Sequence, residues 1–292
     1  MESNFLHAEF SVITKDGLRL FGQSWMPQQA RGIIVLVHGL AEHSGRYDDF
    51  AKNASAAGLG VFAIDLRGHG RSPGEALWVN SFDDYLLDID ALMETVSLSA
   101  APCPLFLMGH SLGGAIAVRW VSQRTEQTRS LHGLVLSSAA LKIGPGTPAL
   151  LVKLAPLISR WLPRLRTQAL DANLISSIAS EVARYRDDPL VCLRAPPART
   201  GAQVLAVMPT NLAAASTLTL PLYVFHGTAD TLTSPEGSQA FHTAWGGSDR
   251  ALRLWTGSMH ETLNDIDRVA VMNELFAWLL PRCERIINSG NL

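Results

Sequence analysis

Residues 105–116 read LFLMGHSLGGAI, which is the most informative stretch of this chain. The apolar run at 105–108 is typical of a buried strand, and helical spacing resumes after Ser111. Glycines two residues before and two residues after Ser111 complete the G-x-S-x-G pattern of a sharp turn between a strand and a helix. Such a turn lifts the serine hydroxyl clear of the sheet, at a helix N-terminus. We therefore predict that Ser111 is a nucleophile.

The rest of the chain repeats this alternation of strand and helix. Alternating residues at 9–13 and 18–25, separated by Lys15-Asp16-Gly17, predict a β-hairpin. Alternation of short apolar runs with amphipathic stretches predicts an α/β protein with a mostly parallel central sheet flanked by helices. The apolar runs are 33–37, 60–64, 105–108, 134–136, 222–225 and 252–255, and the amphipathic stretches include 50–57, 82–98, 113–123 and 268–280.

Residues 141–219 interrupt the alternation without a convincing strand. Apolar residues at helical spacing occur at 148–162, where Pro156 is expected to break the helix, and at 174–182. Because so long a segment cannot be a plain loop in a compact domain, we predict an inserted helical cap. The core would then comprise residues 1–140 and 220–285, and residues 286–292 would form a flexible tail.

Composition narrows the class of protein and its location. The 292 residues carry a formal net charge of −2, which does not suggest a nucleic-acid-binding protein. No apolar run reaches the roughly 18 residues of a membrane span, and the N-terminus MESNFLHAEF has no secretory signal pattern. The cysteines Cys103, Cys192 and Cys283 are few, odd in number and widely spaced, which indicates a reducing compartment. We expect a cytoplasmic protein.

Two further segments provide partners for Ser111. HGTAD at 226–230 follows one strand and TGSMH at 256–260 follows the next, so the chain order is Ser111, Asp230, His260. This is the order of triads that follow a G-x-S-x-G turn. His260 would take the serine proton, and Asp230 would orient His260. Asp265 is a competing acid, but it follows the histidine in the chain.

Backbone N–H groups are candidates for stabilising the oxyanion of the reaction. His38-Gly39-Leu40 ends the strand at 33–37, and the glycine lets the next N–H point into the site. We expect the N–H groups of Leu40 and Leu112 to form the oxyanion hole. The segment DLRGHGRS at 65–72 is assigned to structure, with His69 as a buried hydrogen-bonding residue and not a base.

These segments together resemble the monoacylglycerol lipase and lysophospholipase branch of the α/β-hydrolase superfamily. The narrowest match is HGLAEHSGRY at 38–47, and YRDDPL at 185–190 resembles the Y-x-x-D-P stretch of the cap in that branch. The resemblance extends from 33 to 280. It implies a lipid ester with one acyl chain and a small polar head, and it requires no metal or cofactor.

The resemblance also implies the residues that bind substrate. The cap would supply an apolar tunnel, and Glu42, Arg46, His110 and Tyr185 would hold the head group. From their spacing alone, Glu42 and Arg46 could equally form a local ion pair that shapes the loop. Apolar residues in the first cap helix could make transient contact with a membrane surface or simply pack on the core.

The sequence therefore predicts a serine carboxylic ester hydrolase that cleaves monoacylglycerols through an acyl-enzyme intermediate. A broad carboxylesterase or lysophospholipase is an alternative, as is a proline-iminopeptidase-like aminopeptidase. The aminopeptidase would need cap carboxylates for the substrate amine, for which Glu181, Asp187 and Asp188 are candidates. A ligand receptor with the hydrolase fold is the alternative that is not an enzyme.

Replacing Ser111 tests the assignment of the nucleophile. Ser111→Ala removes the attacking oxygen, so ester hydrolysis should fall by at least about a thousandfold. Labelling by a fluorophosphonate probe should disappear as well, whereas Ser258→Ala should retain labelling. Turnover that survives in Ser111→Ala would contradict the prediction.

Overall fold

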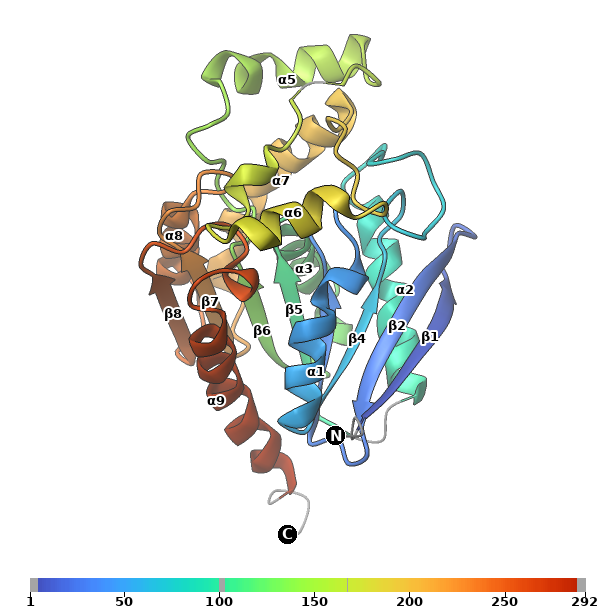
Figure 1. Cartoon of the computed structure of the whole chain (residues 1–292), viewed down its shortest axis with the longest axis vertical. Coiled ribbons are helices and arrows are strands. Elements are labelled where there is room, and N and C mark those ends of the chain that lie inside the picture. Colours follow the sequence, from blue (N-terminus) through green and yellow to red (C-terminus); the bar gives the residue numbers. More distant parts are fainter. Residues whose placement is uncertain (1–4, 100–102, 167, 288–292) are drawn as a thin grey trace.

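An eight-stranded sheet forms the centre of the computed structural model, which describes residues 5–99, 103–166 and 168–287. Its strand order is β1-β2-β4-β3-β5-β6-β7-β8 (Figure 1). All pairs from β4 to β8 are parallel, whereas β2 pairs antiparallel with β1 and β4. The predicted α/β-hydrolase architecture is confirmed. The strands are β1 Phe5–Ile13, β2 Arg19–Pro27, β3 Gly32–Val37, β4 Leu59–Ile64, β5 Leu105–His110, β6 Leu131–Ser137, β7 Leu222–Gly227 and β8 Arg250–Trp255.

Burial on both faces of the sheet explains the continuous apolar runs. Every residue of β3, β4, β5 and β7 is buried. In β3, Ile33 and Val35 pack into one core cluster and Ile34 and Leu36 into another on the opposite face. Because successive side chains of a strand point to opposite faces, a strand covered on both sides must be apolar throughout.

Helices cover the two faces of the sheet (Figure 1). Residues of α1 and α9 contribute to one core cluster, and residues of α2, α3 and α8 to the other. The predicted helix at 82–98 corresponds to α2, whereas α8 lies in a segment where no helix was predicted. These helices are α1 Asp48–Ala56, α2 Asp84–Ser99, α3 Leu112–Gln123, α4 Thr125–Thr128, α8 Pro235–Ala244 and α9 Arg268–Ile287.

The segment 141–219, which we call the cap, carries three α-helices above the sheet (Figure 1). They are α5 Ala149–Trp161, α6 Ala179–Asp187 and α7 Ala198–Ala214. The expected break at Pro156 is wrong, because α5 continues through it. Pro156 is exposed, so the carbonyl that loses its helical partner there can be solvated. The helix expected at 174–182 begins later, at Ala179.

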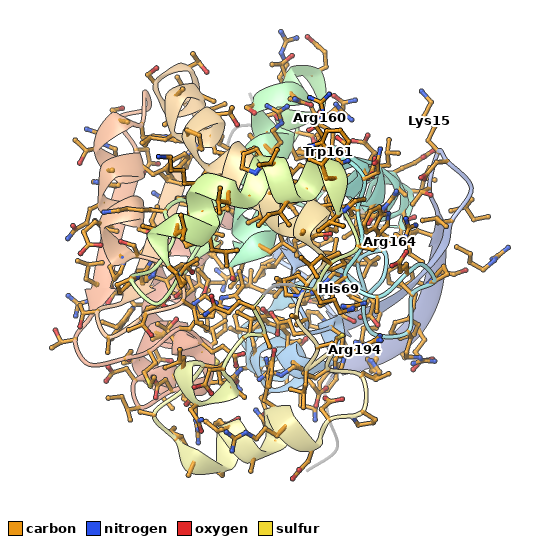
Figure 2. The ribbon with its side chains drawn as sticks, turned by 90° about the horizontal axis from the view of Figure 1, so that it is seen from above. Lys15, His69, Arg160, Trp161, Arg164 and Arg194 are labelled. Atoms are coloured by element: carbon orange, nitrogen blue, oxygen red, sulfur yellow. The ribbon has the colours of Figure 1, made fainter. Side chains whose placement is uncertain are left out.

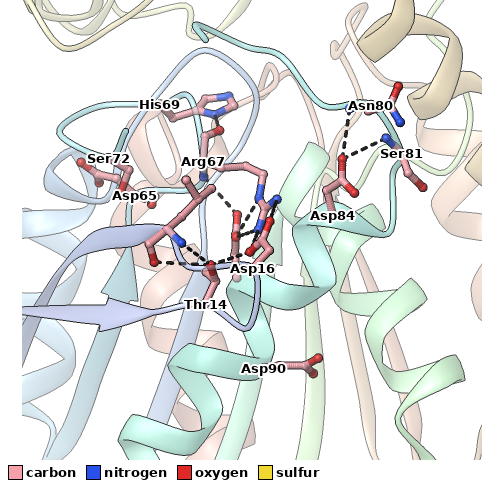
Figure 3. Close-up of polar contacts among 12 residues, drawn as sticks. Thr14, Asp16, Asp65, Arg67, His69, Ser72, Asn80, Ser81, Asp84 and Asp90 are labelled. Atoms are coloured by element: carbon pink, nitrogen blue, oxygen red, sulfur yellow. Dashed lines mark hydrogen bonds and ion pairs between the residues drawn. The ribbon is translucent and has the colours of Figure 1, made fainter. Parts of the chain in front are cut away.

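The segment 65–72 anchors the loops beneath the cap (Figure 3). Arg67 forms ion pairs with Asp16 at 2.9 Å and with Asp88 at 2.7 Å. Asp65 accepts a hydrogen bond from the backbone N–H of Ser44 at 2.8 Å. His69 is buried with Nδ1 2.9 Å from the carbonyl oxygen of Arg67, and burial lowers the pKa of His69 to about 3. A neutral, buried His69 agrees with the structural role expected for it.

The end of the chain differs from the expected tail at 286–292. Helix α9 includes Ile287, so the first two residues of that tail belong to a helix. The rest of the tail prediction lies outside the described residues.

Neither a disulfide nor a metal-binding group of side chains is found in the described residues. Cys103, Cys192 and Cys283 are free thiols. Within the described parts of the chain, no three His, Cys, Asp or Glu side chains group as metal ligands. In the same ranges, none of the helices combines the length and apolar character needed to cross a membrane.

Candidate active site

The turn between β5 and α3 holds Ser111 in a strained conformation, with φ 51° and ψ −117°. Positive φ is uncommon for residues other than glycine and is often associated with functional sites. A Cβ at Gly109 would lie 2.2 Å from the carbonyl oxygen of Gly113, and a Cβ at Gly113 would lie 2.1 Å from that of Val37. Since these contacts exclude any side chain, both glycines are needed for the turn that exposes Ser111.

Two backbone N–H groups beside Ser111 come from different elements. Leu112 is the first residue of α3, so its N–H has no partner within the helix. Leu40 follows Gly39, where an added Cβ would lie 3.2 Å from the Cβ of Ser111. Ala41 has a φ of 71°, which turns the chain directly after Leu40. Leu40 and Leu112 both line the cavity that contains Ser111.

Asp230 and His260 meet at the ends of neighbouring parallel strands. His260 Nδ1 lies 2.7 Å from Asp230 Oδ2, and both residues are buried. The loops that carry them are packed backbone to backbone, since a Cβ at Gly227 would lie 2.2 Å from the carbonyl oxygen of Met259. His260 lines the same cavity as Ser111. The three residues predicted as a triad therefore share one site.

Electrostatics favours a charged aspartate beside a basic histidine. Burial alone would raise the pKa of Asp230, but the attraction of His260 and hydrogen bonds from His226 and His260 hold it well below its usual range. Burial alone would lower the pKa of His260, but the charge of Asp230 and its hydrogen bond outweigh burial and raise it above 6.5. Asp230 can therefore stabilise an imidazolium form of His260.

Asp230 has two further side-chain partners, neither of which was predicted from the sequence. His226 Nε2 lies 2.9 Å from Asp230 Oδ2, and Thr233 donates its hydroxyl to the same oxygen at 2.8 Å. His226 is fully buried, with Nδ1 2.8 Å from the hydroxyl oxygen of Ser238. The sequence signal that could have identified His226 is its position directly after the apolar run 222–225 and just before Gly227. These contacts fix the carboxylate that faces His260.

Asp265, the competing acid, serves a different purpose. It accepts hydrogen bonds from the backbone N–H of Met259 at 2.6 Å and of Ser177 at 3.0 Å. It thereby joins the loop of His260 to the cap and leaves Asp230 as the carboxylate bonded to His260.

A buried guanidinium lies behind the polar end of the cavity. Arg46 pairs with Glu42 at 2.9 Å and with Glu261 at 2.5 Å. Glu42 also accepts from the backbone N–H of Gly39 at 2.6 Å and from the Tyr47 hydroxyl at 2.8 Å. The ion pair of Glu42 and Arg46, weighed earlier as an alternative, therefore exists, and Glu42 braces the loop that carries Gly39 and Leu40. Glu261 was not predicted, although it directly follows His260.

The four predicted head-group residues lie at different depths. Glu42, His110 and Tyr185 line the cavity, whereas Arg46 lies under the Tyr185 ring, 4.5 Å from its centroid. The His110 and His260 rings are 4.8 Å apart. Burial, followed by repulsion from His260, lowers the pKa of His110 to about 4. His110 therefore offers a neutral imidazole beside the candidate base.

One cavity of about 260 Å³ joins this polar end to the cap. Helix α5 contributes Leu151, Ala155 and Ile158 to its wall, and α7 contributes Leu205 and Met208. Apolar pockets with a few convergent polar groups are typical of small-molecule sites. The arrangement can hold an apolar chain in the cap with a reacting carbonyl at Ser111.

The fold and this site define a hydrolase of the α/β-hydrolase class. The chain belongs to the family described as serine aminopeptidase S33, whose family model matches residues 28–267. It is similar to the monoacylglycerol lipase of Mycolicibacterium smegmatis, with 30% identity over 94% of this chain and 97% of that protein. It is 31% identical to the monoglyceride lipase of Mus musculus over 93% of this chain and 90% of that protein.

A solved structure extends the similarity to three dimensions. The crystal structure of Paleococcus ferrophilus monoacylglycerol lipase superposes with a TM-score of 0.80 and 32% identity, covering 97% of this chain and all 100% of that one. The resemblance to the monoacylglycerol lipase branch, inferred from short motifs, is confirmed over nearly the whole chain.

Removing the charge of Asp230 tests its role beside His260. His260 must be neutral to accept a proton, so kcat/KM should fall as the pH drops through its pKa, which lies above 6.5. Asp230→Asn should reduce kcat by about 10³–10⁴-fold. Without the anion, the pKa of His260 should fall, and the acid limb of the pH profile should move to lower pH.

Asp265→Asn is the matched control, because Asp265 is a buried carboxylate of the loop that carries His260 and accepts from backbone N–H groups, not from His260. The acid limb of the pH profile of Asp265→Asn should stay at the wild-type pH. An acid limb that is unchanged in Asp230→Asn would count against the pairing of Asp230 with His260.

Proposed function

We propose that this protein hydrolyses monoacylglycerols to glycerol and a fatty acid. The observation that carries the proposal is the single cavity, apolar along α5 and α7 and polar around Glu42 and Glu261, that contains Ser111. Its apolar part suits one acyl chain, and its polar end suits a small hydroxylated head. The similarity to monoacylglycerol lipases over nearly the whole chain supports the same substrate class.

The proposed reaction has two steps, formation of an acyl-enzyme and its hydrolysis, and each passes through a tetrahedral intermediate with an oxyanion. Ser111 Oγ attacks the ester carbonyl carbon while His260 accepts its proton, and the N–H groups of Leu40 and Leu112 donate to the oxyanion. His260 then protonates the glycerol oxygen as the ester bond breaks, which leaves an acyl-Ser111. His260 then takes a proton from water as the water oxygen attacks the acyl carbon. It returns that proton to Ser111 Oγ as the acyl–Oγ bond breaks and the fatty acid leaves. Asp230 orients His260 throughout.

Charge at the polar end favours a neutral head group. The carboxylates of Glu42 and Glu261 share the single guanidinium of Arg46, and both line the cavity, whereas Arg46 lies behind them. Burial tends to raise the pKa of Glu261, but the charge of Arg46 outweighs it and keeps the pKa lowered. A phosphate head would therefore face negative charge, which argues against a lysophospholipase with anionic substrates.

The cap carboxylates offer little support for an aminopeptidase. Glu181 pairs with Arg184 and Arg268, and Asp188 with His43 at 2.9 Å. Asp187 is exposed on α6. An ammonium group in the cavity would have to compete for Glu42 and Glu261, whose oxygens are already bonded to Arg46, Gly39 and Tyr47.

A head-group panel with one acyl chain tests the proposed substrate. The kcat/KM for monooleoylglycerol should exceed that for oleoyl lysophosphatidic acid by at least about tenfold, because a desolvated phosphate would face two carboxylates. Proline β-naphthylamide should not be cleaved detectably. Glu261→Gln should narrow the ratio between the neutral and the anionic lipid. Equal rates on both lipids, or faster cleavage of the amide, would favour the alternatives.

We further propose that the cap touches a membrane surface transiently while the protein remains otherwise in the cytoplasm. Leu157 and Trp161 of α5 are 56% and 70% exposed. Residues 141–170 contain five basic residues and no acidic residue, although the whole chain has a net charge of −2. Figure 2 looks onto the cap from above and labels four of its side chains, Arg160, Trp161, Arg164 and Arg194. Exposed apolar residues beside basic ones are typical of helices that lie on anionic membranes.

Vesicle binding tests this contact. Leu157→Glu places a charge in the exposed apolar face, so binding to phosphatidylglycerol-containing vesicles should weaken by at least about tenfold in cosedimentation. Leu98→Glu is the matched control, because Leu98 is 82% exposed at the far end of α2. Binding of the wild type should also weaken with salt. Equal binding by both variants would contradict a contact through α5.

A further inference from the structure

Close packing explains the glycines of the α-helices that the structure describes, with one exception. An added Cβ would lie 2.1 Å from the carbonyl oxygen of Val37 at Gly113, and 2.5 Å from the Cβ of Ala139 at Gly114. At Gly237 in α8 it would lie 2.6 Å from the Cβ of Lys142. At Gly201 in α7, by contrast, no described heavy atom beyond the helix's own neighbouring backbone lies within 4 Å of the added Cβ.

The backbone does not require a glycine at 201 either. Gly201 is absent from the residues with positive φ, and its N–H donates to the carbonyl oxygen of Pro197 at 3.0 Å as in an ordinary helix. Glycine inside a helix is less favourable than alanine because it loses more backbone freedom on folding. Gly201 therefore makes the helix less stable than alanine would, and neither a close contact nor the backbone conformation explains why a glycine stands there.

Gly201 lines the cavity. Its neighbours on the wall, Ala198 and Ala202, are also small, whereas Leu205 and Met208 further along α7 are large. The first turn of α7 therefore presents small residues to the cavity at these positions, and Leu205 and Met208 present large side chains further along the helix.

Helix α7 extends from the neighbourhood of Ser111 outward into the cap. Near its C-terminal end, Asn211 donates to the carbonyl oxygen of Ala115 at 2.8 Å, and Ala115 lies in the first turn of α3 after Ser111. Gly201 precedes Asn211 by ten residues, which corresponds to about 15 Å along a helix axis. Gly201 therefore lies at the end of the cavity wall remote from the reacting carbonyl.

We propose that Gly201 determines acyl-chain selectivity, by leaving room beside α5 for the distal part of a long acyl chain. The inference rests on the proposed function, because it assigns the cavity to the acyl chain of an ester. A side chain at position 201 would occupy the space of the distal methylenes and leave the geometry at Ser111 unaltered. Its effect should therefore increase with chain length.

The test is the ratio of kcat/KM for monooleoylglycerol to kcat/KM for monooctanoylglycerol. Gly201→Leu should lower this ratio by at least about tenfold relative to the wild type. Gly201→Ala should lower it less, and should raise Tm because alanine favours the helix and meets no atom there. Ala206→Leu is the matched control, since Ala206 is an exposed residue of the same helix, and its ratio should equal that of the wild type.

An unchanged ratio in folded Gly201→Leu would overturn the inference, whether kcat/KM stays at the wild-type level or falls equally on both lipids. If Gly201→Leu does not fold, the ratio and Tm of Gly201→Ala decide, and a lower Tm would contradict open space at position 201. A graded series of p-nitrophenyl esters separates this inference from the proposed function. A wild type that cleaves no monoacylglycerol refutes the proposed substrate, while the ester series still reports whether position 201 limits chain length.

Discussion

The close backbone approach around Ser111 is the constraint on which the rest of the molecule depends. The turn after β5 touches the end of β3 so closely that Gly113 meets the carbonyl oxygen of Val37. That contact places the N-terminus of α3 beside the loop that carries Leu40. It also requires β3 and β5 to be neighbours in the sheet, as they are. One steric requirement thus couples the topology of the core to the geometry of the site.

A second layer of organisation is electrostatic. Arg46 joins the loop after β3 to the loop after β8, because it bonds Glu42 from the first and Glu261 from the second. Glu42 passes this restraint to the backbone of Gly39, and Tyr185 covers the guanidinium from the cap. Buried ion pairs are weak evidence for stability but can specify one arrangement of the groups around them. Here the arrangement is that of the loop with Gly39 and Leu40, the loop with His260 and Glu261, and the cap.

The core could be predicted from sequence because each of its signals is local. A buried parallel strand is a short apolar run, and the partners of Ser111 follow two such runs in a fixed order. The cap was harder, since its helices are apolar on more than one side. Leu151 and Ile158 of α5 face the cavity while Leu157 and Trp161 face outward, so periodicity alone does not locate the wall. Helix continuity through Pro156 depends on solvent exposure, and the contact of His226 with Asp230 depends on tertiary packing.

Helix α7 combines two tasks that are separate in a simpler α/β unit. Its N-terminal half forms part of the cavity wall, and its C-terminal half packs on α3 and returns the chain from β6 toward β7. A crossover helix cannot swing away without exposing the core beneath it. Helix α5 packs against α7 and carries its own exposed side. Opening of the cavity would therefore require movement of α5, because α7 is held to the core.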